Sequence, residues 1–206
     1  MIPYTIKRIS SNYHDEELAD IYSSATAIRT CIGEGSFEQL EGQVPDFTLN
    51  LLREHRNKRY PIYVNDFSML LKYRLLNEAK ASLLDYADMS EELANRIIHQ
   101  RNLFLSFEQF CDILKTKEVT YSRISRALLH ILLGIKKCDC EEIPYARVLG
   151  FRKDATNVMK TIKKQGDIPL VTKLSAFSHP MLEKDIYAAN LYESVVTDMY
   201  KQSFIN

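Results

Sequence analysis

The sequence lacks the features that identify most membrane, secreted and phosphate-loop proteins. Its 206 residues contain no apolar run long enough to cross a bilayer and no charged leader followed by an apolar segment. No G-x-G-x-x-G or G-x-x-x-x-G-K-[ST] motif is present, which excludes the usual glycine-rich phosphate loops. Because 46% of the residues are hydrophobic, the chain can bury a substantial core, and we expect a soluble, cytoplasmic protein of one or two domains.

Cysteine is scarce, and there is no excess of either charge. The four cysteines include one C-x-C pair, Cys138 and Cys140, with no second ligand pair nearby, so we predict reduced thiols and no metal site. The five histidines show neither metal-ligand nor nucleophile–base spacing, and we assign no catalytic residue. With 27 basic and 27 acidic residues, global electrostatics do not indicate a nucleic-acid-binding protein.

The chain does contain long stretches of helical periodicity. Apolar spacing and capping residues predict helices over residues 44–55, 67–76, 90–98, 106–114, 120–135 and 181–200, and Asn65 or Asp66 is expected to cap the second of these. Two short strands, 145–151 and 170–173, flank a predicted helix over 153–164, which by the usual handedness gives a right-handed parallel βαβ unit. The predicted fold class is therefore mainly α with minor β (α+β), a helical bundle with a small βαβ unit near the carboxy terminus.

The segment from Ser23 to Arg29 has the residue types of a phosphate site. Ser24 or Thr26 can cap a helix that begins near Ala25, which leaves the first backbone amides free to face an anion. Arg29 follows one turn later, with a planar guanidinium that suits phosphate. An ordinary capped helix with a solvated arginine explains the same spacing, so the residues alone leave both interpretations open.

A short strand is expected upstream of this helix. Residues 3–9 alternate and include β-branched side chains, and they lead into a loop over residues 10–15. Arg8 stands near the end of that strand, where it can either contact a ligand or cover apolar surface with its aliphatic stem.

Together these segments resemble the tRNA(Met) cytidine acetate ligase family, whose catalytic domain has the HIGH-type nucleotidyltransferase fold. SSATAIR at residues 23–29 is similar to the family's ISSTxIR signature, although Ser23 precedes Ser24 and Ala25 is inserted before Thr26. TIKRISSNYHDEEL at residues 5–18 is similar to the segment before it. RISRALLHILLGI at residues 123–135 and the stretch over residues 145–173 are similar to the family's carboxy-terminal domain. The resemblance therefore covers nearly the whole chain.

The resemblance implies an ATP-dependent ligase. In such an enzyme acetate is activated as acetyl-adenylate, and the wobble cytidine of elongator tRNA(Met) is acetylated to N4-acetylcytidine. Carried over by motif, Arg8, Ser24, Thr26 and Arg29 would bind the triphosphate of ATP, with Mg²⁺ assisting and acetate as co-substrate.

One half of such an active site is missing from the sequence. The family's catalytic half opens with a strand and an HxGH-type motif, and no HxGH occurs in these 206 residues. We therefore expect residues 1–34 to be the end of a Rossmann-like nucleotidyltransferase domain, a remnant that contains a strand, a loop and the phosphate helix. Residues 35–206 are expected to form a mostly helical carboxy-terminal domain that binds tRNA. The isolated chain is expected to have little or no activity.

Local basic clusters are the candidate RNA contacts. Arg123 and Arg126 share a helix face, and Arg147, Arg152 and Lys153 begin a stretch over residues 147–164 with six basic side chains and one acid. The resemblance favours tRNA contact by these five residues. The sequence alone favours a solvated surface balanced by distant acids.

Two other functions stay open on the sequence. One is a nucleotidyltransferase that acts on a small cofactor precursor, for which SSATAIR would serve equally well. The other is a non-catalytic RNA-binding or adaptor domain that keeps SSATAIR only as a structural cap.

Overall fold

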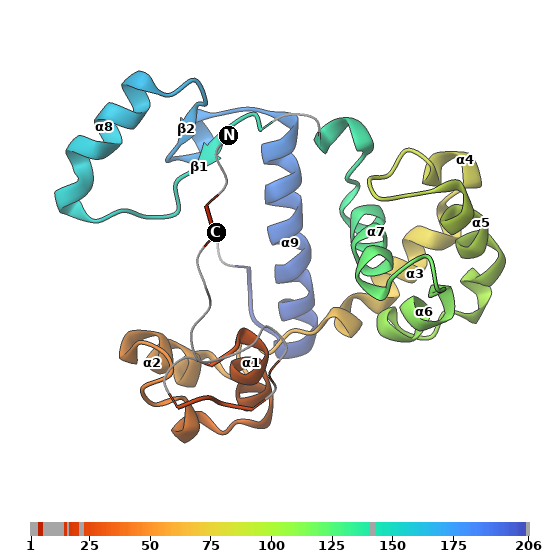
Figure 1. The fold of residues 1–206 in the computed structure, drawn as a ribbon, viewed down its shortest axis with the longest axis horizontal. Coiled ribbons are helices and arrows are strands. Elements are labelled where there is room, and N and C mark those ends of the chain that lie inside the picture. Colours follow the sequence, from red (N-terminus) through yellow and green to blue (C-terminus); the bar gives the residue numbers. More distant parts are fainter. Residues whose placement is uncertain (1–3, 6–14, 16, 21–22, 141–142, 205–206) are drawn as a thin grey trace. The chain divides into compact units, whose positions relative to one another are not determined.

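The computed structural model describes residues 4–5, 15, 17–20, 23–140 and 143–204, which form helices and one pair of short strands (Figure 1). The predicted fold class, mainly α with minor β, is confirmed. The chain packs as two compact units, Met1–Ile62 with Val196–Ser203 and Tyr63–Val195 with Phe204–Asn206. The strand predicted over residues 3–9 lies outside the described residues apart from Tyr4 and Thr5, and the domain boundary predicted after residue 34 stays a prediction.

The first unit is built on two short helices. It contains α1 (Ala25–Glu34), a 3₁₀ turn (Phe37–Leu40) and α2 (Asp46–His55). Its buried core residues come from all three elements: Cys31, Phe37, Leu40 and Leu49. Because this core is small, the first unit depends on the local bonds that fix the ends of its helices.

Gly35 ends α1. Its φ of +83° is a left-handed conformation that glycine adopts without a Cβ penalty, and its N–H donates to the carbonyl of Cys31 at 2.9 Å. The guanidinium of Arg56 lies 5.2 Å from the centroid of the Phe37 ring and also covers Gly35, where a Cβ would come within 1.9 Å of Nη1. The left-handed conformation of Gly35 therefore ends α1.

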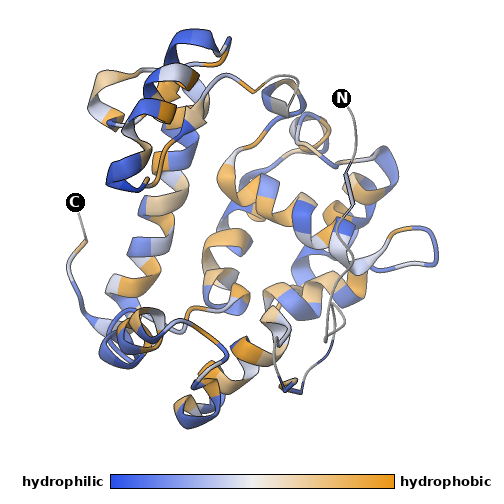
Figure 2. Cartoon of the chain, turned by 60° about the vertical axis from the view of Figure 1, so that its left-hand side comes forward, coloured by the Kyte–Doolittle hydropathy of each residue, from blue (hydrophilic) through white to orange (hydrophobic). Residues whose placement is uncertain are grey.

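The second unit contains a bundle of helices. Its elements are a 3₁₀ turn (Val64–Phe67), α3 (Ser68–Asn77), α4 (Lys80–Leu83), α5 (Glu91–Gln100), a 3₁₀ turn (Arg101–Leu103), α6 (Phe107–Leu114) and α7 (Tyr121–Leu133). Helix α7 packs against α3 and α6, and its Ile124, Leu128 and Ile131 are fully buried. Apolar and polar residues alternate along these helices (Figure 2), so each turns its apolar face toward the core.

Local caps begin α5 and α6 and end α7. The hydroxyls of Ser90 and Ser106 accept from the amides three residues later, at 3.2 and 3.3 Å, and Gly134 ends α7 with a φ of +71°. The cap predicted for α3 is wrong, because a 3₁₀ turn precedes that helix and neither Asn65 nor Asp66 caps it. Asn65 Oδ1 instead accepts from the amide of Glu108 at 3.0 Å.

A small parallel unit and a long helix complete the chain. Its elements are a 3₁₀ turn (Lys137–Cys140), β1 (Ala146–Arg147), a 3₁₀ turn (Lys153–Ala155), α8 (Thr156–Gln165), β2 (Leu170–Val171), a 3₁₀ turn (Leu174–Ala176) and α9 (Pro180–Tyr200). The strands pair in parallel, which confirms the predicted β–α–β order. They are shorter than predicted, with two residues each, and among the described residues each strand pairs only with the other.

The first turns of α9 hold this parallel unit and the end of α7. Tyr145 donates its hydroxyl to Asp185 Oδ2 at 2.6 Å, just before β1. Lys184 Nζ donates to the carbonyl of Gly134 at 2.7 Å and to Asp139 Oδ2 at 2.5 Å. Although burial raises the pKa of Asp139, the hydrogen bonds from Lys184 and from the amide of Lys136, with the charges of both lysines, together outweigh it and the pKa is lowered. The residues of α9 divide between the two units after Val195.

Candidate functional site

Ser24 is the N-cap of α1. Its Oγ accepts from the amide of Ala27 at 3.0 Å and donates to the carbonyl of Asp15, and the residue is 1% exposed. The predicted cap is therefore confirmed, and both bonding directions of the hydroxyl are already used within the protein. Contact between Ser24 and a nucleotide stays a prediction.

The additional serine of the segment has its own partners. Ser23 Oγ accepts from the amide of Ala19 at 2.9 Å and donates to Gln43 Oε1 at 2.7 Å, while Gln43 Nε2 donates to the carbonyl of Ala19 at 2.8 Å. This closed set of bonds fixes the chain that enters α1. Gln43 could not be predicted from the sequence, because no local pattern links it to a segment 20 residues earlier.

Thr26 and Arg29 face solvent one turn apart on α1. Thr26 is half-buried and Arg29 is exposed, and neither side chain bonds to any other part of the chain that the structure describes. The amides of Ala25 and Thr26 likewise have no acceptor among the described residues, and the first turn carries no acid. A positive helix end, two amides, a hydroxyl and a guanidinium together suit an anion. Arg8 lies outside the described residues.

The predicted RNA contacts on α7 lie beside an acid. Arg126 Nε pairs with Asp88 Oδ2 at 3.0 Å, and His130 Nδ1 lies 3.7 Å from the same oxygen. The bond from Arg126 lowers the pKa of Asp88, with smaller contributions from the charges of His130 and Arg123. Asp88 therefore already neutralises part of the predicted basic face of α7.

The other predicted contacts are exposed on the parallel unit. Arg147 is in β1, and Arg152 and Lys153 lie where the chain enters α8. Arg152 Nε is 3.9 Å from Asp154 Oδ1, and both side chains are largely exposed, so this ion pair is weak. Thus the structure places these three residues in one unit with Arg123 and Arg126, but on different elements.

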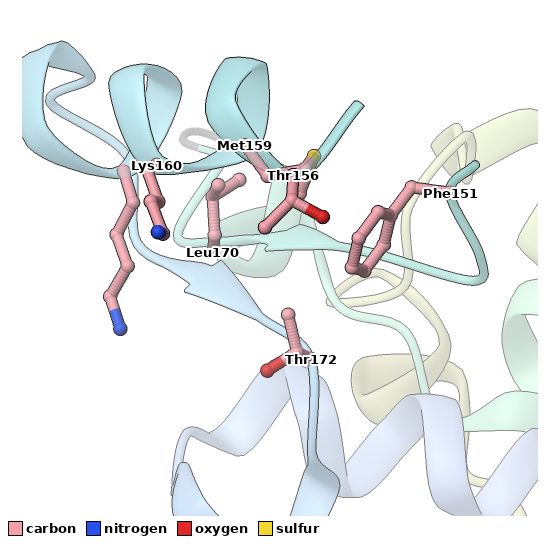
Figure 3. A pocket seen from close by; sticks show the side chains of 7 residues that line it. Phe151, Thr156, Met159, Lys160, Leu170 and Thr172 are labelled. Atoms are coloured by element: carbon pink, nitrogen blue, oxygen red, sulfur yellow. The ribbon is translucent and has the colours of Figure 1, made fainter. Parts of the chain in front are cut away.

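A pocket opens between α8 and β2 in this unit (Figure 3). It has a volume of about 150 Å³ and is lined by Phe151, Thr156, Met159, Lys160, Lys163, Leu170 and Thr172. The two lysines belong to the basic stretch over residues 147–164, but no pattern in the sequence pointed to the other lining residues. Met159 and Leu170 were unremarkable apolar positions, and only the parallel pairing of β1 with β2 brings them together.

The described ranges lack the features of a metal site and of a membrane span. No three of the His, Cys, Asp and Glu residues described there gather into a possible metal site. No described helix combines the length and apolar character needed to span a membrane. Cys31, Cys111 and Cys138 are free thiols, and burial raises the pKa of Cys111 to about 12, which leaves its thiol protonated near neutral pH.

The chain is similar to a group of RNA-modifying enzymes. The tRNA(Met) cytidine acetate ligase of Thermoanaerobacter sp. strain X514 is 35% identical over 212 residues, which cover 98% of this chain and 51% of that protein. The ligase of the same name from Bacillus subtilis strain 168 is 33% identical, over 99% of this chain and 52% of that protein. The chain thus spans about half the length of the curated relatives it matches.

Solved structures show the same fold. The apo crystal structure of Thermotoga maritima TmcAL (form I) matches 96% of this chain and 52% of its own, with a TM-score of 0.81 and 23% identity. The form II structure of that protein, bound with alpha-thio ATP, matches 87% of this chain and 49% of its own, with a TM-score of 0.73 and 24% identity. The family described as HIGH Nucleotidyl Transferase matches residues 1–205, and the chain belongs to this nucleotidyltransferase family.

Proposed function

We propose that this chain supplies part of the ATP site and the tRNA-binding domain of a ligase that acetylates the wobble cytidine of elongator tRNA(Met). One observation carries the proposal. The N-terminus of α1 presents amides, Thr26 and Arg29 to solvent without an acid in its first turn, in a chain similar over 98% of its length to a tRNA(Met) cytidine acetate ligase. The geometry at the start of α1 and the similarity to these ligases therefore both support the proposal.

ATP is the proposed ligand of α1. Thr26 and Arg29 would contact its triphosphate, and Arg8, from the segment before the helix, would join them. Ser24 would act at this site by holding the helix end in place, because its hydroxyl bonds to Ala27 and Asp15. The alpha-thio ATP bound by the Thermotoga maritima protein supports ATP as the nucleotide. The described residues supply no set of metal ligands, so no residue of this chain is assigned to Mg²⁺.

The proposed reaction has two steps. An oxygen of acetate attacks the α-phosphorus of ATP, the bond to the β-phosphate oxygen breaks, and acetyl-adenylate and pyrophosphate form. The N4 amine of the cytidine then attacks the acetyl carbonyl, loses a proton and releases AMP. Arg29 and the helix end would stabilise negative charge on the departing pyrophosphate, and the remaining groups of the site would lie outside this chain.

Residues 35–206, which include the second unit, are the proposed tRNA-binding part. Arg123, Arg126, Arg147, Arg152 and Lys153 would contact phosphates, and RNA affinity would then fall as salt rises. We place residues 1–34 in the nucleotidyltransferase domain and residues 35–206 in the tRNA-binding domain. A cytoplasmic location is also proposed, because tRNA is the proposed substrate and Cys31, Cys111 and Cys138 form no disulfide among the described residues.

The triphosphate contact can be tested directly on this chain. Titration with inorganic tripolyphosphate, followed by amide NMR shifts, should perturb the amides of Ala25 and Thr26, and Arg29→Gln should weaken the binding. Arg53→Gln is the matched control, because Arg53 is an arginine of the same unit whose charge is paired with Glu41 at 2.9 Å. Equal binding by the two variants would contradict the site.

Activity provides the second test. ATP–pyrophosphate exchange with acetate should be absent when this chain is assayed alone, because no HxGH motif is present. Robust exchange would show that the chain holds a complete site and would defeat the half-site proposal.

A further inference from the structure

Helix α8 has apolar side chains that no core covers. None of its residues is buried, and Val158 and Ile162, one turn apart, are 58% and 45% exposed. Phe151, which precedes the helix, is 52% exposed. Phe151 also lines a pocket, whereas Val158 and Ile162 do not, so the exposed apolar side chain that bears on the pocket is the Phe151 ring.

The adjoining pocket has an apolar middle and two different ends. In Figure 3 the labelled side chains run from Lys160 through Leu170 and Thr156 to the Phe151 ring, with Thr172 below them. Its volume of about 150 Å³ is below the roughly 300 Å³ at which pockets for drug-sized ligands begin. A small flat group fits such a site better than a complete nucleotide does.

The positive charge around the pocket favours an anionic ligand. Between residues 147 and 164 six basic side chains face a single acid, Asp154. No carboxylate in the described ranges pairs with Lys160 or Lys163. An acidic peptide would satisfy the lysines but offers no flat group for Phe151 and Leu170. A nucleotide of single-stranded RNA carries both a planar base and flanking phosphates, and exposed aromatic rings beside basic side chains are the usual platform for it.

We propose that this pocket binds one unpaired base of a single-stranded RNA segment. The base stacks on Phe151 and packs over Leu170, Thr156 and Thr172 offer hydroxyls to its edge, and Lys160 and Lys163 hold the neighbouring phosphates. The proposal deepens the tRNA-binding function proposed above and rests on it, because it names where a loop of the tRNA is held.

Binding by the full 206-residue chain tests the stacking contact. Fluorescence anisotropy with a labelled single-stranded RNA should show Phe151→Ala to be about tenfold weaker than the parent, whereas a duplex of equal length should bind both equally. Phe151→Tyr, which keeps the aromatic face, should restore the affinity. Leu149→Ala is the matched control, since this neighbouring apolar residue is 88% exposed and does not line the pocket.

The phosphate contacts predict a change in salt dependence. Lys160→Gln/Lys163→Gln should reduce the slope of log affinity against log salt by about 1.4, because each contact with a single strand contributes about 0.7. Lys115→Gln/Lys117→Gln is the control, a pair of exposed lysines in the bundle outside the pocket.

The outcomes separate this proposal from the proposed function. If the chain binds tRNA(Met) but Phe151→Ala and the pocket lysine pair behave like their controls, the pocket proposal is overturned and the tRNA-binding function stands. If a polyglutamate peptide or phosphatidylserine vesicles, and not RNA, show the dependence on Phe151, the pocket binds another anionic partner and the proposal is again overturned. If the parent chain binds no tRNA, both proposals fail.

Discussion

Neighbouring residues at the start of α1 have separate tasks. The side chain of Ser24 points into the protein and bonds to Ala27 and Asp15, whereas Thr26 and Arg29 face solvent. A sequence motif groups such residues together. Spacing along the chain does not distinguish a residue that caps the helix from one that would contact a ligand at the helix end. The cap itself was predictable, since its bond spans only three residues.

Replacement of Ser24 by alanine should destabilise the protein. The change removes the N-cap bond and leaves the carbonyl of Asp15 without this donor, which should lower the free energy of unfolding by about 1–2 kcal/mol. Urea unfolding followed by circular dichroism measures the loss. Thr26→Ala is the matched control and should change stability little, because its side chain bonds to no other described residue. A comparable loss in both variants would contradict this division of tasks.

Among the secondary-structure elements, those with local signals were predicted well. Ser90 and Ser106 lie three residues before the amides that they cap, so the sequence alone shows both partners. The cap predicted for α3 is wrong because Asn65 bonds to Glu108, 43 residues later in the chain. The pocket beside α8 was missed for the same reason, because Phe151 and Leu170 meet only after β1 and β2 have paired.

A buried polar network joins α3 to the end of the bundle. Tyr86 is 2% exposed, donates its hydroxyl to Glu78 Oε1 at 2.5 Å and accepts from Arg74 Nη2 at 3.1 Å. Lys136 Nζ lies 3.5 Å from the centroid of the same ring. Burial, followed by the bond to Glu78, raises the pKa of Tyr86 to about 12. The phenol therefore stays protonated over the pH range in which the unfolded chain would begin to lose that proton.

Replacement of Tyr86 by phenylalanine should cost about 1–3 kcal/mol of unfolding free energy at neutral pH, because Glu78 loses a buried donor. The folded pKa is raised above the unfolded value of about 10, so this contribution is fully present below pH 10 and is lost as pH rises toward 12. Unfolding measured between pH 7 and 11 should show the two proteins converging at the alkaline end. Tyr73→Phe, at a residue that is 68% exposed, should show neither effect.

For the whole molecule, the net charge is zero, but basic and acidic residues are unevenly distributed along the chain. The composition predicts no attraction for RNA, yet the stretch over residues 147–164 contains six basic side chains and one acid. On α7, in contrast, Asp88 already neutralises Arg126. Sequence counting could not separate these two clusters, because Asp88 precedes Arg126 by 38 residues and only the packing of the bundle brings them together.

Removing the exposed charges of Arg152 and Lys153 should therefore weaken RNA binding more than removing the charge of Arg126, which is paired with Asp88. Arg152→Gln/Lys153→Gln removes two exposed charges, of which only Arg152 has an acid nearby, and should reduce the slope of log tRNA affinity against log salt by about 1.4–1.8. Arg126→Gln, measured in the same salt titration, should change the slope by less than one contact, because the charge of Arg126 is already balanced by Asp88 at 3.0 Å. If Arg126→Gln had the larger effect, tRNA would have to displace Asp88 on binding, and α7 would be the main RNA-binding face.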